Sequence, residues 1–225
     1  MNTLLLRLSG TMQSWGVQSR FGVRDTGLEP SKSGVLGLIC AAMGIDRAND
    51  NNLANLARLR MGVRVDREGR LKVDYHTAQN VLKAGGGMKD TELSNRYYLA
   101  DAMFLVGLES DDLTLLESIH TAMHHPVWPL YLGRKAFVPG EPVCLKDGLM
   151  FRQDLFNSLK TYPYLGRAGK PDRLRIVLED NEGEIVCLDQ PLSFYSRRFA
   201  PRRLKTDFIP TPESIVEATA CTSPA

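Results

Sequence analysis

The hydrophobic pattern of the chain opens with a nearly continuous run of leucines over residues 3–9. Such a run is typical of a strand that is covered on both faces, because neither face then needs polar side chains. A second apolar segment predicts a buried helix that begins at Ser31 or Ser33. Gly44 is well placed to end this helix, since glycine readily adopts the left-handed conformation of a C-cap.

Two further helices are predicted from apolar residues at helical spacing. The first covers residues 52–59, where the leucines fall on one face. The second begins at Asp111 or Asp112, either of which can cap its first turn, and must end before Pro126.

Alternating residues predict two strands over 61–66 and 71–77, joined as a hairpin by a turn at 67–70. Residues 80–96 contain three consecutive glycines among charged residues, so they are predicted to form a long irregular excursion, and loops of that length are usually functional. Residues 97–108 then predict a single strong strand.

This order of elements approximates the split βαβ pattern of ferredoxin-like folds, of which the RNA-recognition motif is one. The predicted fold class is therefore α+β, with a ferredoxin-like domain over residues 1–147. Strands at 173–179 and 184–189 are predicted to pair as a hairpin in a smaller β-rich C-terminal lobe at 148–210. Residues 211–225 are expected to be a poorly ordered tail.

The charge is unevenly distributed, although the formal net charge of the 225 residues is only +2. Residues 1–100 hold 14 Lys and Arg against 9 Asp and Glu, whereas residues 101–225 hold 14 against 17. Residues 193–205 contain five Lys and Arg and no acid. One basic and one acidic face would suit a nucleic acid on one side and another partner on the other; a patchwork of solvated charge fits the composition equally well.

The four cysteines show no Cys-x-x-Cys spacing, which excludes zinc fingers and disulfide scaffolds and predicts a cytoplasmic protein. The longest apolar stretch, residues 35–43, is too short to cross a bilayer, so no membrane association is expected. No spacing of His, Asp and Glu suggests a metal. Residues 26–33 lack the glycines of a Walker A loop, and no cofactor is expected.

The segment Pro30-Ser31-Lys32-Ser33-Gly34 at the start of the predicted helix is a candidate anion site. Free backbone N–H groups, the helix dipole, two hydroxyls and the ammonium of Lys32 all favour a negative group there. A plain helix cap without a ligand explains the segment equally well.

The loop that follows the first strand mixes amides, aromatic rings and cations, among them Gln13, Trp15, Ser19, Arg20 and Arg24. Such a mixture suits single-stranded RNA, whose bases stack on rings and whose phosphates bind Arg. Taken alone, Trp15 is better interpreted as a core residue.

A second cluster of aromatic and basic residues contains Tyr131, Arg134 and Lys135. With His124 and His125, Tyr131 and Lys135 could form a general acid–base set that cleaves RNA through its 2′-hydroxyl. The alternative is that His is favoured near the C-terminus of a helix.

Several segments together resemble CasD-type subunits of the type I-E CRISPR Cascade complex, a family of the RAMP superfamily. The matching segments are residues 6–16, 19–21, 24–26, 30–38, 75–80, 96–102 and 129–139, and the resemblance extends over about residues 1–205. Thr11 stands where a proline is usual and Ser31 where threonine is common; neither departure removes a charge.

The resemblance implies a modified RNA-recognition-motif fold in which residues 80–96 form an inserted thumb hairpin. It implies a non-catalytic subunit that holds the 5′ handle of crRNA and caps the foot of the complex in antiviral defence. Its partners would be the backbone and large subunits of Cascade, with target DNA reached only through the complex. A related type I-C subunit cuts RNA with a Tyr/Lys/His set, so a metal-independent endoribonuclease that processes precursor crRNA is the alternative function.

The residues predicted to contact RNA come from both the local patterns and the resemblance. They are Gln13, Trp15, Ser19, Arg20, Arg24, Ser31, Lys32, Ser33, Asn80, Arg96, Tyr131, Arg134, Lys135, Arg202 and Arg203.

Overall fold

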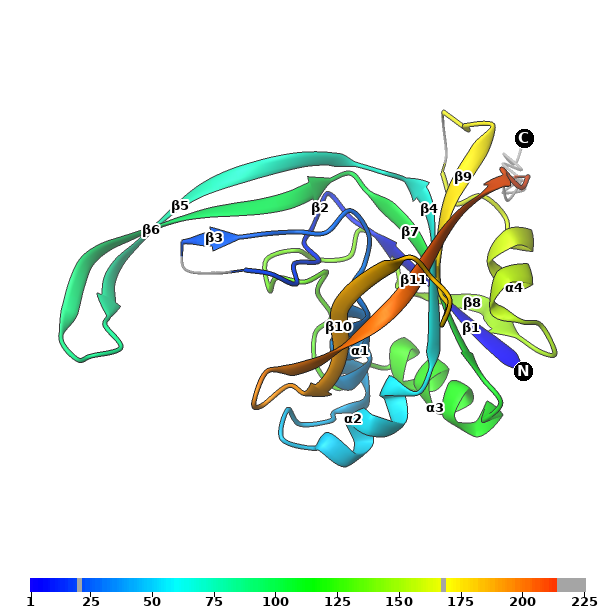
Figure 1. Cartoon of the computed structure of the whole chain (residues 1–225), viewed down its shortest axis with the longest axis horizontal. Helices are drawn as coiled ribbons and strands as arrows, with labels where there is room; N and C mark the ends of the chain where they lie inside the picture. Colours follow the sequence, from blue (N-terminus) through cyan, green and yellow to red (C-terminus); the bar gives the residue numbers. More distant parts are fainter. Residues whose placement is uncertain (20–21, 167–168, 214–225) are drawn as a thin grey trace, which may run out of the picture.

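The computed structural model describes residues 1–19, 22–166 and 169–213, and its centre is a seven-stranded antiparallel sheet (Figure 1). In sheet order the strands are β10 (Ile185–Ser193), β11 (Arg198–Pro210), β9 (Arg173–Glu179), β4 (Arg60–Arg67), β7 (Met103–Ser110), β1 (Asn2–Ser9) and β8 (Cys144–Met150).

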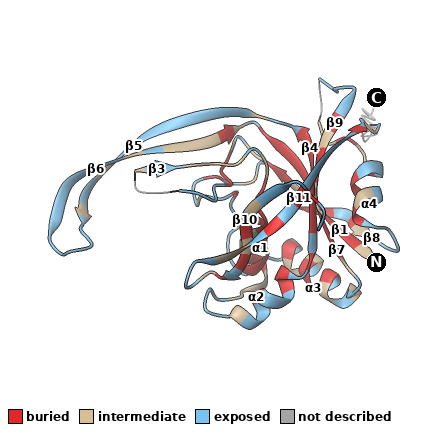
Figure 2. Ribbon diagram, viewed as in Figure 1, coloured by how far each residue is buried: buried red, intermediate tan, exposed pale blue. Residues whose placement is uncertain are grey.

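The leucine-rich strand β1 is covered on both faces, as its sequence predicts. Leu4, Leu6 and Leu8 belong to one hydrophobic cluster, whereas Leu5 belongs to a second, and all four side chains are fully buried. The first cluster contains residues of α1 (Lys32–Met43), α2 (Asp50–Ala57) and α3 (Leu113–His124); the second contains residues of α4 (Leu155–Thr161). The buried strands run through the middle of the body in Figure 2.

The predicted helices begin and end close to their sequence signals. Ser31 caps α1, and its hydroxyl accepts a hydrogen bond from the Gly34 N–H at 3.3 Å. Gly44 ends α1 with a φ of 68°, in the left-handed region that favours glycine. Asp112 caps α3 through the Leu115 N–H, and α2 begins at Asp50, two residues before its predicted start.

The hairpin predicted for residues 61–66 and 71–77 is wrong. β4 pairs with β7 and β9 in the main sheet. The strand after it, β5 (Arg70–Leu82), instead pairs with β6 (Met88–Ala100) along its whole length. Alternation of apolar residues indicates a strand but does not identify its partner, which explains the error.

Residues 80–96 are not irregular, because within the β5–β6 hairpin they form the end of β5, a glycine-containing turn and most of β6. The hairpin extends away from the body (Figure 1) and is mostly exposed (Figure 2). Its strands have 13 residues each, so charged residues and glycines that resembled a loop lie in and between two long solvated strands.

The single strand predicted over residues 97–108 is divided in two. β6 ends at Ala100 and β7 begins at Met103, with Asp101 at a φ of 58° between them. The bend takes the chain from the hairpin into the main sheet. Two short strands, β2 (Met12–Gln13) and β3 (Val23–Arg24), pair with β6, so the base of the hairpin belongs to a second, four-stranded sheet.

The C-terminal strands extend the main sheet rather than form the predicted hairpin between residues 173–179 and 184–189. β9 pairs with β4 and β11, and β10 is an edge strand that pairs with β11 alone among the described residues. The predicted division at residue 148 therefore falls within one continuous sheet. Of the predicted tail, residues 214–225 lie outside the described residues. No helix among the described residues is long and apolar enough to cross a membrane.

Candidate nucleic-acid interface

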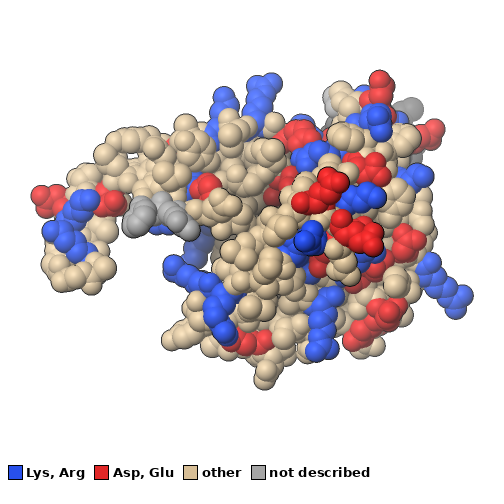
Figure 3. All heavy atoms as spheres, viewed as in Figure 1, with Lys and Arg blue, Asp and Glu red and all other residues tan. Residues whose placement is uncertain are grey.

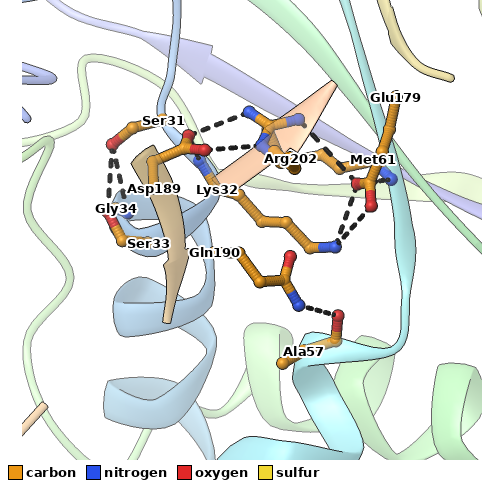
Figure 4. Close-up of polar contacts among 10 residues, drawn as sticks. All are labelled: Ser31, Lys32, Ser33, Gly34, Ala57, Met61, Glu179, Asp189, Gln190 and Arg202. Carbon is orange, nitrogen blue, oxygen red and sulfur yellow. Dashed lines mark hydrogen bonds and ion pairs between the residues drawn. The ribbon is translucent and has the colours of Figure 1, made fainter. Parts of the chain in front are cut away.

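A carboxylate of the chain itself binds the backbone at the start of α1. The backbone N–H of Lys32 donates to Asp189 Oδ2 at 2.7 Å, and Asp189 is fully buried (Figure 4). The helix N-terminus does favour an anion, as expected. Because Asp189 supplies it, the prediction that Ser31 and its neighbours hold an RNA phosphate here is corrected: Ser31 is a buried cap.

Arg202 neutralises this buried carboxylate and is not free to bind RNA. Its Nε lies 2.6 Å from Asp189 Oδ1 and its Nη2 lies 2.9 Å from Oδ2, a bidentate pair. Burial raises the pKa of Asp189, but the hydrogen bonds and charge of Arg202 outweigh it and hold that pKa below its usual value. The predicted RNA contact at Arg202 is therefore wrong.

Lys32 is likewise an interior residue, with 1% of its surface exposed. Its Nζ lies 3.1 and 2.9 Å from the two carboxylate oxygens of Glu179 (Figure 4). Burial lowers the pKa of Lys32, and the charge of Glu179 opposes that change. Its ammonium cannot reach a phosphate from this position, which corrects the prediction made for it.

Gln13 and Trp15 are also buried, so neither presents a surface on which a base could stack. The Gln13 amide donates to the Ala102 carbonyl at 2.8 Å and its oxygen accepts from the Trp15 indole at 3.2 Å. A Cβ at Gly34 would lie 2.8 Å from the indole, so Trp15 packs directly on α1. Both residues hold the loop in place rather than face solvent.

Asp25 organises the loop that begins at Gly16. Its carboxylate accepts hydrogen bonds from the backbone N–H groups of Val17 and Gln18 at 3.2 and 3.0 Å and from the Ser19 hydroxyl. Burial raises the pKa of Asp25, but these hydrogen bonds outweigh it and lower that pKa below its usual value. A Cβ at Gly16 would lie 2.5 Å from Asp25, so the loop can close only with glycine there.

The segment around Arg134 approaches the same loop from the other side. Arg134 Nη2 donates to the carbonyls of Tyr97 at 2.8 Å and Arg24 at 3.2 Å, and its guanidinium lies 5.3 Å from the centre of the Phe137 ring. Gly133 has a φ of 90°, and a Cβ there would lie 1.7 Å from the Ser14 carbonyl oxygen. The close approach therefore requires glycine at this position.

These segments line an open, polar pocket of about 340 Å³. Its lining residues are Ser14, Gly16, Ser19, Arg24, Asp25, Arg96, Gly133 and Arg134. Burial and the nearby charge of Arg96 lower the pKa of Arg134, with Asp74 and Asp25 opposing the change. Among the lining residues, three arginines stand against one carboxylate, so the pocket has an excess of positive charge that a bound anion would neutralise. We refer to it as the three-arginine pocket.

Four of the predicted RNA-binding residues meet in this pocket: Ser19, Arg24, Arg96 and Arg134. Sequence reasoning did not select Ser14, Gly16, Asp25 or Gly133. Gly16 follows Trp15, and Gly133 lies between Tyr131 and Arg134, so both glycines belong to segments noted for aromatic and basic residues. That position was the available sequence signal for them, and the signal for Asp25 was its place next to Arg24.

The other predicted residues lie elsewhere or outside the described residues. Ser33 and Tyr131 line a separate groove of about 350 Å³ along α1, together with Trp128 and Phe194. Asn80 is exposed on the hairpin and has a φ of 52°. Lys135 and Arg203 are exposed. Arg20 falls outside the described residues.

The histidines of the alternative catalytic set contact other histidines. Within residues 1–19, 22–166 and 169–213, no hydrogen bond links a histidine to Tyr131 or Lys135. His124 instead stacks edge-on against His120, with ring centres 4.8 Å apart, and lies 6.5 Å from the ring of His125.

Charge on the surface is mixed on the face shown in Figure 3. Acidic and basic side chains alternate over the body, and both signs occur near the end of the hairpin. On the hairpin, Lys89 pairs with Glu92. The local excess of arginines in the pocket is thus a better guide to an anionic ligand than the charge of a whole face.

Known proteins resemble this chain over most of its length. The family model of CRISPR-associated protein (Cas_Cas5) matches residues 3–206. The chain belongs to this Cas5 family. The hairpin, the residues of the three-arginine pocket and all of the main sheet except Asn2 and residues 207–210 fall within the matched range.

Individual CRISPR-associated proteins are also similar to this chain in sequence and structure. The CRISPR system Cascade subunit CasD of Escherichia coli (strain K12) is 30% identical over 212 residues, which cover 88% of this chain and 92% of that protein. A solved structure titled "Crystal structure of Cas protein" has a TM-score of 0.79 and 46% identity, covering 94% of this chain and 98% of that one. A chain of a "CRISPR RNA-guided surveillance complex" has a TM-score of 0.77 and 34% identity, with 93% and 90% covered.

Proposed function

We propose that this Cas5-family chain is a non-catalytic, RNA-binding subunit of a Cascade surveillance complex that holds the 5′ handle of crRNA. Membership of the family supports the proposal, as do a relative named as a Cascade subunit and a similar chain in an RNA-guided surveillance complex. Its partners would be the handle itself, the backbone and large subunits of the complex and, through them, target DNA, all in the cytoplasm.

The observation that carries the proposal is the three-arginine pocket. Guanidinium groups bind phosphate through paired N–H donors and stack on bases, which suits a polar pocket that must hold RNA. Arg134 is fixed by two carbonyls, whereas Arg24 is exposed and Arg96 is half-buried. The pocket therefore combines one preorganised cation with two that remain accessible to a ligand.

The fold supports an RNA-recognition role. β4, β7, β1 and β8 lie in this order in the sheet, with α1 between β1 and β4 and α3 between β7 and β8. In a ferredoxin-like domain the second, third, first and fourth strands have the same arrangement. The β5–β6 hairpin is inserted between the second and third of these strands, where a thumb would be expected, and we propose that it clamps the RNA next to the pocket.

Apolar side chains on the hairpin support a role in assembly. Leu71, Val73 and Tyr75 of β5 are each more than half exposed, although strands that contact only water usually carry few such groups. We propose that neighbouring subunits or the RNA cover them in the complex.

The test compares RNA binding by the full chain and its pocket variants. Arg24→Ala and Arg96→Ala should each weaken binding of an RNA that carries the 5′ handle about tenfold, equivalent to about 1.4 kcal/mol. Each should also make the slope of log affinity against log salt concentration shallower by about 0.7. The reason is that binding with one phosphate contact fewer releases fewer counterions from the RNA.

Arg58→Ala is the matched control, because Arg58 is exposed at the end of α2 and does not line the pocket. Its affinity and salt slope should equal those of the unmodified chain. If all three variants bind alike, the pocket does not hold RNA and the proposed site is wrong.

A further inference from the structure

Two histidines and a cysteine converge outside the three-arginine pocket. His120 and His124 stand four residues apart on α3 and therefore on one face of the helix. Cys144 is the first residue of β8, which packs against α3. One ligand atom from each of the three residues lies within 4.8 Å of the other two. The histidine spacing was visible in the sequence, but the cysteine 20 residues further on was not connected to it.

Hydrogen bonds already orient two of these groups. His120 Nε2 lies 3.0 Å from the Leu145 carbonyl oxygen. Because a carbonyl can only accept, Nε2 carries the hydrogen and Nδ1 keeps the lone pair that a metal ion requires. A metal-binding histidine commonly donates its other N–H to a backbone carbonyl in this way. Cys144 Sγ lies 3.6 Å from the backbone carbonyl oxygen of His120, which holds the thiol against α3.

We propose that His120, His124 and Cys144 bind one Zn²⁺ ion. Nitrogen and thiolate ligands suit Zn²⁺ and exclude Mg²⁺ and Ca²⁺, which take oxygen ligands. In a tetrahedral site, Zn–N and Zn–S bonds of about 2.0 and 2.3 Å place the ligand atoms about 3.5 Å apart. His124 is exposed at the last turn of α3, so rotation of its side chain closes the remaining distance.

Binding converts the Cys144 thiol to a thiolate and releases its proton to solvent, so that sulfur donates an electron pair to the ion. Three protein ligands leave the fourth position to water. The ion would join the end of α3 to the first residue of β8. This assigns His124 a structural role and removes it from the alternative catalytic set.

The experiment uses the full chain without a histidine tag, because a tag would bind Zn²⁺ itself. After treatment with a chelator, the protein competes with a fluorescent zinc indicator for Zn²⁺. One equivalent should bind, and Zn²⁺ should raise the midpoint of thermal unfolding, since it binds the folded state. Co²⁺ in place of Zn²⁺ should give a near-ultraviolet thiolate-to-metal charge-transfer band.

Substitutions identify the ligands. His124→Gln and Cys144→Ala should each weaken Zn²⁺ binding at least about 100-fold, and Cys144→Ala should abolish the Co²⁺ band. His125→Gln and Cys187→Ala are the controls, which change the neighbouring histidine and another thiol and should leave both signals unchanged.

Absence of binding by the unmodified chain, or equal binding by His124→Gln and its control, would overturn the proposal. Circular dichroism checks that each variant folds. Should Cys144→Ala fail to fold, the exposed His124 still decides the question, because its replacement leaves the core intact.

Discussion

Lys32 and Arg202 carry positive charge that serves the interior of the protein. Together with Asp189 and Glu179 they join the start of α1 to β9, β10 and β11 (Figure 4). Arg64 is another interior cation, on the other face of the sheet, where it is fully buried and pairs with Asp66 at 2.7 Å. A basic residue in this sequence is thus informative about RNA only when its surroundings are known.

Lys32→Met should lower the free energy of unfolding by about 3 kcal/mol, because Glu179 would lose its closest cation while Arg202 stays 3.8 Å away. Urea denaturation measures the change. Lys72→Met, at an exposed position on β5, is the control and should change stability by less than about 0.5 kcal/mol. Equal effects of the two substitutions would show that the buried pair is not needed for stability.

Asp25→Asn should remove a pH-dependent part of the stability. The pKa of Asp25 is lower in the folded chain than its ordinary value of 3.8, so ionisation of this carboxyl stabilises the fold. That contribution is present above the unfolded pKa and is lost as pH falls through the folded pKa.

Denaturation at several pH values tests this. The stability difference between the unmodified chain and Asp25→Asn should be largest near neutral pH and should shrink in acid. Asp90→Asn, at an exposed position near the end of the hairpin, is the control for loss of a surface charge. A difference that stays constant with pH would contradict the assignment.

At the scale of the elements, the β5–β6 hairpin is separable from the core. Residues 78–92 can be replaced by Asn-Gly between Thr77 and Leu93, which face each other in the ladder, because a two-residue turn of this kind closes antiparallel strands. The part of β6 that pairs with β2 and β3 remains, since those contacts lie at Asn95 and beyond.

The midpoint of thermal unfolding should change by only a few degrees, since the removed residues are mostly exposed. RNA binding and assembly should be lost if the hairpin is a thumb. Differential scanning fluorimetry and co-purification with partner subunits measure the two effects. A shortened chain that assembles normally would contradict a clamping role.

Sequence reasoning predicted the elements whose signals are local. Ser31 and Gly44 delimit α1, Asp112 caps α3, and the leucines of β1 indicate burial on both faces. Strand pairing is not local, so both hairpins predicted from alternation were wrong. The local pattern of residues 80–96 indicated an irregular segment, and only the resemblance implied a hairpin there, because β5 has no buried residue and β6 is buried only near its end.

The candidate site was predictable only in part for the same reason. Arg24, Arg96 and Arg134 come from three distant segments, and the sequence does not show that they meet. Nor does it show that Asp189 reaches the start of α1 from a position 157 residues beyond Lys32. Burial in each case depends on which strands become neighbours.

For the whole molecule, the non-catalytic role remains a prediction with a direct test. If the proposed non-catalytic role is right, the full chain incubated with repeat RNA in EDTA should not cleave it. Gel electrophoresis of end-labelled RNA detects cutting. Site-specific cleavage that disappears in His125→Ala would establish the endoribonuclease alternative instead.

The most direct test of the central claim is nuclease footprinting of crRNA in the reconstituted complex. With the unmodified chain or Arg58→Ala, the nucleotides of the 5′ handle should be protected. With Arg24→Ala and Arg96→Ala combined, protection of the handle should fall while the rest of the crRNA stays protected. Full protection of the handle in that double variant would contradict the account.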